Sequence, residues 1–174
     1  MAPKMFTELW KAFLSLIQHP SDSVAIVNRK AFLNTIAWSE GTPQIPNSDD
    51  GYRAIVGGGT FENYATHPNI KVWIKKIGAF SDAAGRYQLM ARYYAPYCKQ
   101  LGLKDFSPAS QDAIALQQIR ECKALNDVDA GNFESAIEKC GRIWASLPTS
   151  TLGQSIRTMN QVKEIYVKAG GTVA

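Results

Sequence analysis

The sequence predicts an α+β fold in which a mostly helical body carries a small antiparallel β lobe, and this lobe forms one wall of a cleft. Apolar residues recur at helical spacing over most of the chain. Residues 41–82 differ, because they combine glycine, proline and asparagine with short β-branched runs, which is typical of hairpins. The 174 residues, 45% hydrophobic and 20% charged, have the composition of a folded globular domain.

The chain begins with an amphipathic segment, and its apolar stripe predicts a helix over residues 6–17 that His19 and Pro20 end. The stripe consists of Phe6, Leu9, Trp10, Phe13, Leu14 and Ile17. It either docks on the main domain or contacts an anionic membrane or lipopolysaccharide surface, which the flanking Lys4 and Lys11 would favour. We therefore divide the chain into a helical extension, residues 1–28, and a main domain, residues 29–174.

A second helix is expected from Ser21 or Ser23, either of which can cap it, to about Ser39. Gly41 and the Thr42-Pro43 pair that follows end this helix. The β lobe comes next, and its glycine triplet at 57–59 suits a tight turn. Further helices are predicted over residues 84–101, 108–119, 133–145 and 153–168.

Basic residues are concentrated in one part of the chain. The net charge is +4, but residues 71–104 contain seven basic residues and one acidic residue, a net of +6. This segment is either a solvated surface or a binding surface for a polyanion. Trp73, which has lysines on both sides, is expected to be exposed.

The three cysteines, Cys98, Cys122 and Cys140, are odd in number and lack paired spacings. A secreted disulfide framework is therefore not expected, and we interpret them as buried thiols of a protein made in a reducing cytosol. We expect neither a membrane-spanning segment, since no apolar run is long enough, nor a cleavable signal peptide.

Glu40 has the position most suggestive of catalysis. It follows Phe32 and Ile36 at i+8 and i+4, so its carboxyl group is expected on the apolar face of the second helix. Burial and the negative end of the helix dipole would both raise its pKa. A carboxyl group still protonated near neutral pH can act as a general acid toward a glycosidic oxygen. The alternative is a terminal-turn side chain that simply extends into solvent.

A conventional glycosidase needs a second carboxylate, and the candidates are Asp49, Asp50 and Glu62. Spacing favours none of them, and without one the nucleophile could be a hydroxyl group of the sugar itself. Zinc hydrolysis is not expected, since the chain offers only His19 and His67 and has no HExxH or paired-cysteine motif. Motifs for acyl or phosphoryl transfer are also absent, so neither a metal nor a cofactor is expected.

Six ordered blocks of this sequence resemble the lambda-type phage endolysins: RKAFLNTIAWSEGT, GYRAIVGGGTFENYATHP, AAGRYQL, KQLGLKDFSPASQDAIALQQI, RIWASLP and KEIYVKAGGT. They extend over about residues 29–172. The resemblance implies a lysozyme-like fold and cleavage of the β-1,4 bond between N-acetylmuramic acid and N-acetylglucosamine in bacterial peptidoglycan. It also implies a lytic transglycosylase that leaves a 1,6-anhydro-muramic end, with Glu40 as acid and then base.

The same resemblance implies that Arg86, Tyr87, Gln88 and Gln154 contact the substrate. Tyr52 and Trp144 are aromatic candidates for stacking on sugar rings, and Ser39, next to Glu40, completes the expected substrate-binding set. Leu152 departs from the family, which has tyrosine there. A hydrolytic muramidase and, less favoured, a non-catalytic cationic protein that binds walls or membranes are the alternatives.

The expected partner is peptidoglycan rather than nucleic acid, and the protein is expected to be a monomer. The resemblance implies synthesis in the host cytoplasm and release to the periplasm at lysis through a separate holin.

Overall fold

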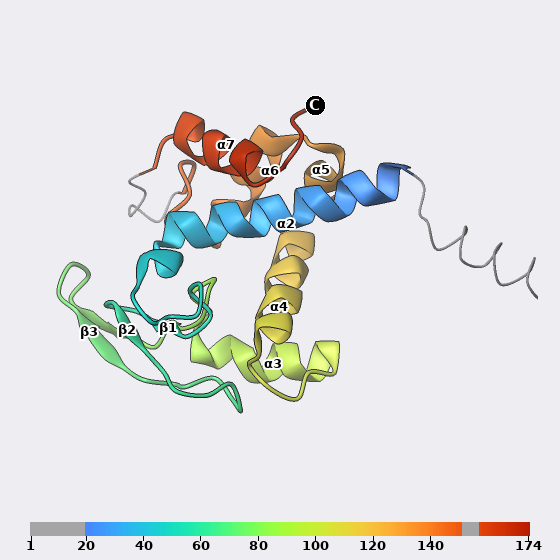
Figure 1. Ribbon diagram of the computed structural model, residues 1–174. Coiled ribbons are helices and arrows are strands. Elements are labelled where there is room, and N and C mark those ends of the chain that lie inside the picture. The colour runs from blue at the N-terminus through green and yellow to red at the C-terminus, as the bar shows by residue number, and fades with distance from the viewer. Residues whose placement is uncertain (1–19, 151–156) are drawn as a thin grey trace, which may run out of the picture.

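The computed structural model describes residues 20–150 and 157–174 and confirms the expected α+β architecture (Figure 1). Helix α2 (Pro20–Glu40) crosses the molecule, with a helical layer on one side and the β lobe near its C-terminal end. The other helices are η1 (Thr42–Gln44), α3 (Ala91–Leu101), α4 (Pro108–Glu121), α5 (Leu125–Ala130), α6 (Phe133–Cys140) and α7 (Met159–Lys168). The helix predicted over residues 6–17 lies outside the described residues.

The β lobe contains two small antiparallel sheets, as the turn-rich composition predicted. Strand β1 (Ala54–Ile55) pairs with β2 (Gly59–Thr60), and β3 (Val72–Ile74) pairs with β4 (Ala79–Ser81). Gly57, with a φ of 89°, and Gly58, with a φ of 94°, make the turn between β1 and β2. Such left-handed conformations favour glycine, which explains the triplet in the sequence.

The main core forms between α2 and the helical layer that covers it. Phe32 of α2 is fully buried, and its ring meets that of Phe133 edge-on at a centroid distance of 6.1 Å. Phe133 also packs on Tyr166 of α7 at 4.6 Å. A second cluster around Phe61 and Phe106 lies under the β lobe. The first core therefore stabilises the helical body, and the second joins the lobe to α3 and α4.

Helix α3 begins at Ala91, so the prediction that it begins at residue 84 was wrong. Ala84 instead forms isolated β-bridges with Ile55 and Leu89. Gly85 has a φ of 79° and Gln88 a φ of 53°, and neither conformation fits a right-handed helix. These residues therefore form a tight turn before α3.

Two other helix predictions need correction, and one helix was missed. Helix α6 ends at Cys140 rather than residue 145. Helix α7 begins at Met159, where Thr158 and Gln161 form a capping box. Helix α5 was not predicted, because its six residues are too few to show a clear period.

The boundary proposed after residue 28 falls inside α2. Asn28 is fully buried and its side-chain oxygen accepts a hydrogen bond from the Thr172 backbone N–H at 2.9 Å. All three cysteines are free; Cys122 and Cys140 are buried as expected, whereas Cys98 is partly exposed. Within residues 20–150 and 157–174, none of the helices has the length and apolar character needed to cross a membrane.

Candidate active site

Glu40 is the last residue of α2, at the end nearest the β lobe. Phe32 and Ile36, one and two turns before it, are fully buried, so this face of the helix points into the core. Glu40 itself is half-buried. The helix stops there because Gly41 adopts a left-handed conformation with a φ of 75°. The expected placement of Glu40 on the core side of α2 is confirmed.

Two opposing effects act on the Glu40 carboxyl group. Burial raises the pKa of Glu40, because removal from water disfavours the charged form. The hydroxyl group of Ser146 donates a hydrogen bond to Glu40 Oε1 at 2.6 Å, which lowers the pKa. Burial is the larger effect, so the pKa lies above its ordinary value. The carboxyl group is therefore suited to donate a proton.

Ser146 was not among the residues predicted for the site. It lies 106 positions from Glu40, in the turns that follow α6. No periodic pattern connects two residues so far apart. Its presence in the RIWASLP block was the only available signal.

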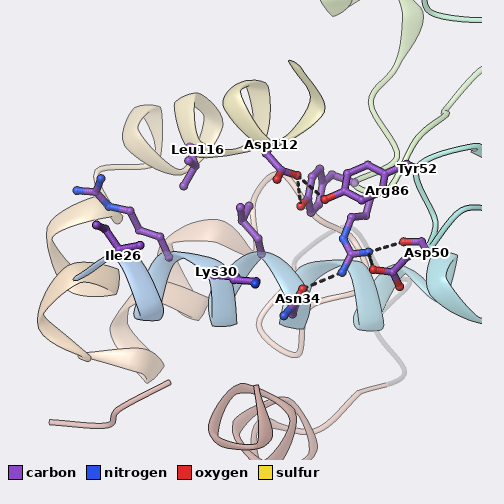
Figure 2. Close-up of a pocket in the computed structure, with 11 residues that line it drawn as sticks. Ile26, Lys30, Asn34, Asp50, Tyr52, Arg86, Asp112 and Leu116 are labelled. Atoms are coloured by element: carbon purple, nitrogen blue, oxygen red, sulfur yellow. Dashed lines mark hydrogen bonds and ion pairs between the residues drawn. The ribbon is translucent and has the colours of Figure 1, made fainter. Parts of the chain in front are cut away.

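Arg86 links the helical body to the β lobe (Figure 2). Its guanidinium group is ion-paired with Asp50 of the lobe and donates a hydrogen bond to Asn34 Oδ1 of α2 at 2.8 Å. The same group lies over the Tyr52 ring, 4.9 Å from its centroid. The Arg86 carbonyl oxygen accepts from the Thr42 hydroxyl at 2.7 Å. Because Arg86 is only 4% exposed, the main role of its side chain is to join these elements.

Tyr52 and Tyr87 both contact Asp112 of α4, and Figure 2 shows Tyr52 beside Asp112. Their hydroxyl groups donate to Asp112 Oδ1 at 2.9 and 2.6 Å. Burial, and then the negative charge of Asp112, raises the pKa of Tyr52 to about 12 and also raises the pKa of Tyr87. Both phenols therefore remain neutral donors. Asp112, like Ser146, is a site neighbour that the sequence patterns did not reveal.

A cavity of about 450 Å³ opens beside this network. Helices α2 and α4 lie along two opposite sides of it, and Asp50 and Tyr52 of the lobe lie at one end. Lys30 and Leu116 extend it toward the N-terminal part of α2. Glu40 is not part of its lining, so this cavity lies along α2 and away from the candidate acid.

The remaining predicted substrate-binding residues have different environments. Ser39 is 4% exposed and Trp144 is 3% exposed, so neither presents a surface to a sugar ring. The Trp144 indole N–H instead donates to the Tyr87 carbonyl at 3.1 Å, which holds the turn before α3. Gln88 is half-buried and donates to the Gly85 carbonyl at 3.0 Å. Gln154 and Leu152 lie outside the described residues.

The three candidates for a second carboxylate are exposed, and two of them have partners. Asp50 pairs with Arg86, and Asp49 Oδ2 accepts from the Tyr64 hydroxyl at 2.5 Å. Both aspartates have positive φ values of 53°, which agrees with their interpretation as turn residues. Glu62 lies on the surface of the lobe.

In the part of the chain that the structure describes, no three His, Cys, Asp or Glu side chains are grouped closely enough to hold a metal ion. His67 is buried, and its Nε2 lies 2.9 Å from the Leu89 carbonyl oxygen. Its ring also packs on Phe106 at 4.8 Å. His67 is thus part of the core of the lobe.

Comparisons with known proteins agree with this geometry. The family profile described as Endolysin matches residues 30–173. The endolysin of Escherichia phage lambda is 49% identical over 148 residues, which cover 83% of this chain and 92% of that protein. The endolysin of Escherichia phage P2 is 42% identical over 158 residues, which cover 84% of this chain and 95% of that protein.

The fold is also that of a solved relative. The structure of bacteriophage lambda lysozyme complexed with a chitohexasaccharide superposes with a TM-score of 0.81 at 47% identity, covering 85% of this chain and 97% of the other. A second structure of lysozyme from bacteriophage lambda gives a TM-score of 0.78 at 46% identity. The lysozyme-like fold is confirmed, and the chain belongs to the endolysin family.

Proposed function

We propose that this protein degrades bacterial peptidoglycan and thereby lyses the host, by cleaving the β-1,4 bond between N-acetylmuramic acid and N-acetylglucosamine. Membership of the endolysin family supports the substrate class, as does the sugar oligomer bound in the lambda lysozyme structure. The observation that carries the proposal is the Glu40 carboxyl group, half-buried at the end of α2 with a raised pKa.

We further propose that the reaction is a lytic transglycosylation. Protonated Glu40 gives its proton to the glycosidic oxygen as the bond from that oxygen to the anomeric carbon breaks. The C6 hydroxyl of the muramic acid then attacks the anomeric carbon and loses its proton to the Glu40 carboxylate. The product is a 1,6-anhydro sugar, no water is consumed, and Glu40 ends protonated as it began.

Ser146 supports both steps of this scheme. Its hydroxyl group, 2.6 Å from Glu40 Oε1, restricts the orientation of the carboxyl group before the proton is transferred. After transfer it stabilises the carboxylate that must act as a base. One serine hydroxyl can therefore serve the acid and the base form of the same residue.

A hydrolytic muramidase is the second candidate. In that reaction water attacks the anomeric carbon, assisted by Asp49, Asp50 or Glu62. Arg86 engages Asp50 and Tyr64 engages Asp49, and both contacts hold these carboxylates in structural roles. This favours the sugar hydroxyl over an activated water as the nucleophile.

The masses of the released muropeptides distinguish the two reactions. Sacculi digested with the wild-type protein should yield products lighter by one water than those of a hydrolytic lysozyme. Products of hydrolytic mass would exclude transglycosylation and leave peptidoglycan cleavage intact.

Glu40→Gln tests the catalytic assignment. It should lower the rate of wall clearance by at least ~10³-fold, since the amide cannot donate the proton, while the circular dichroism spectrum stays that of the wild type. Glu138→Gln, at an exposed position on α6, is the matched control and should retain activity. A folded Glu40→Gln protein that clears cell walls at the wild-type rate would refute the assignment and favour a non-catalytic cationic protein.

A further inference from the structure

The β3–β4 hairpin carries exposed aromatic side chains that the proposed chemistry does not use. Trp73 and Phe80 are direct cross-strand partners, so they share one face, and their rings meet edge-on at 5.1 Å. Trp73 is 55% exposed and Phe80 is 63% exposed. The opposite face carries Val72, which packs toward the turn at Gly57. The aromatic face therefore points away from that turn and into solvent.

Positive charge surrounds this aromatic pair. Lys71 and Lys75 stand two residues before and after Trp73, which is the spacing of one strand face, and both are exposed. Lys76 adds a third exposed ammonium group at the turn. From residue 63 to residue 81 the sequence contains no aspartate or glutamate, so nothing in this stretch neutralises the lysines.

One aliphatic side chain extends the apolar surface at the turn of the hairpin. Ile77 is 48% exposed there. We name Lys71, Trp73, Lys75, Lys76, Ile77 and Phe80 the hairpin surface. Exposed apolar groups surrounded by one sign of charge mark interaction sites.

We propose that the hairpin surface docks on an anionic phospholipid bilayer, a contact that goes beyond the proposed wall cleavage. Tryptophan and phenylalanine partition to the boundary between headgroups and acyl chains, and isoleucine adds apolar area. The three lysines are attracted to phosphate headgroups. The bilayer therefore complements both the apolar groups and the charge.

A glycan strand is the competing occupant, and the side chains of the hairpin surface fit it less well. Recognition of sugar hydroxyls depends on precisely placed polar groups that both donate and accept hydrogen bonds. Residues 70–80 contain no Asn, Gln, Asp, Glu, Ser or Thr side chain. Isoleucine and phenylalanine also have no hydrogen-bonding group, whereas a bilayer requires none.

Cosedimentation of the full chain with vesicles tests the proposal. Vesicles that contain phosphatidylglycerol should bind the protein, and vesicles of phosphatidylcholine alone should bind it at least ~10-fold less, because the lysines lose their partners. The double variant Trp73→Ala/Phe80→Ala should weaken binding to the anionic vesicles about tenfold. Lys71→Gln/Lys75→Gln should weaken it by a similar factor and reduce its dependence on salt.

Matched controls use exposed residues on α3 and the following loop. Tyr93→Ala removes an aromatic ring that is 44% exposed, and Lys99→Gln/Lys104→Gln removes two exposed charges. Both control variants should bind vesicles like the wild type. Equal binding to neutral and anionic vesicles, or unchanged binding by the hairpin variants, overturns the proposal. So does a hairpin variant that keeps vesicle binding but no longer binds sacculi, because the surface would then belong to the glycan.

Discussion

At the scale of single residues, the hydrogen bond from Ser146 to Glu40 should determine where activity falls at high pH. Removing the hydroxyl in Ser146→Ala takes away the contact that lowers the Glu40 pKa, so the pKa should rise further. Activity of a general acid falls as pH rises through its pKa, so the alkaline limb of the profile should move upward by about one pH unit. The measurement is kcat/KM on sacculi against pH, with Ser146→Thr as the conservative control. A profile that keeps its wild-type alkaline limb would show that Ser146 does not act on Glu40.

Burial of Glu40 should also cost stability at neutral pH. The pKa of Glu40 is raised in the folded protein. Its contribution to the free energy of unfolding is therefore fully present below the unfolded-state pKa, and it is lost as pH rises through the folded-state pKa. Glu40→Gln stays neutral throughout and should therefore be more stable than the wild type at pH 7. The melting temperature should rise by about 2–4 °C for each kcal/mol recovered, and the difference should vanish near pH 4. Calorimetry at both pH values checks this, and a difference that is equal at both would contradict it.

Residues on one helix face can be predicted from sequence, whereas residues that meet across the fold cannot. Glu40 follows from its i+4 and i+8 spacing to buried apolar residues of its own helix. Ser146 and Asp112 reach the site only because α4 and the turns after α6 are folded against α2 and the lobe. Trp144 illustrates the reverse, since an aromatic residue expected to contact sugar lies in the core.

At the scale of secondary-structure elements, Arg86 is the main polar connection between the lobe and α2. Arg86→Lys keeps the charge but cannot reach Asp50 and Asn34 at once. The free energy of unfolding should fall by about 2 kcal/mol, as expected for a buried charge that loses part of its hydrogen bonding. Urea denaturation measures it, with Arg53→Lys, on the partly exposed Arg53, as the control. An equal loss in both variants would show that Arg86 does not connect these elements.

The start of α4 was predicted well because this helix has its own N-terminal signal, whereas the start of α3 is set by tertiary contacts and was not. The prediction for α4 began correctly at Pro108, where the Ser107 hydroxyl accepts from the Ser110 N–H. Residues 84–90 have helical composition but are held in a turn by a bridge between Ala84 and Leu89 and by a second bridge from Ala84 to Ile55 of the lobe, so the start of α3 was misplaced. Tertiary pairing outweighs intrinsic helix propensity there.

At the scale of the whole molecule, the excess of basic residues lies on the surface, apart from one buried arginine. Of the seven basic residues in the segment 71–104, six are exposed, whereas Arg86 is buried and paired. Binding of Glu40→Gln to sacculi should therefore weaken about tenfold between low and high salt, because long-range attraction to wall carboxylates is screened. Binding to an uncharged chito-oligosaccharide is the control and should be insensitive to salt. Sacculus binding that does not change with salt would exclude electrostatic attraction.

The contact between Asn28 and Thr172 determines where the chain can be shortened. The Asn28 amide also donates to the Asp129 carbonyl, so a single side chain in the middle of α2 is hydrogen-bonded both to α5 and to the C-terminal segment after α7. A truncation at the proposed boundary would delete these hydrogen bonds together with two turns of α2. An experiment on the role of the first residues should therefore remove residues 1–19 and spare Pro20 onward, so that a lost function is not confused with a loosened C-terminus.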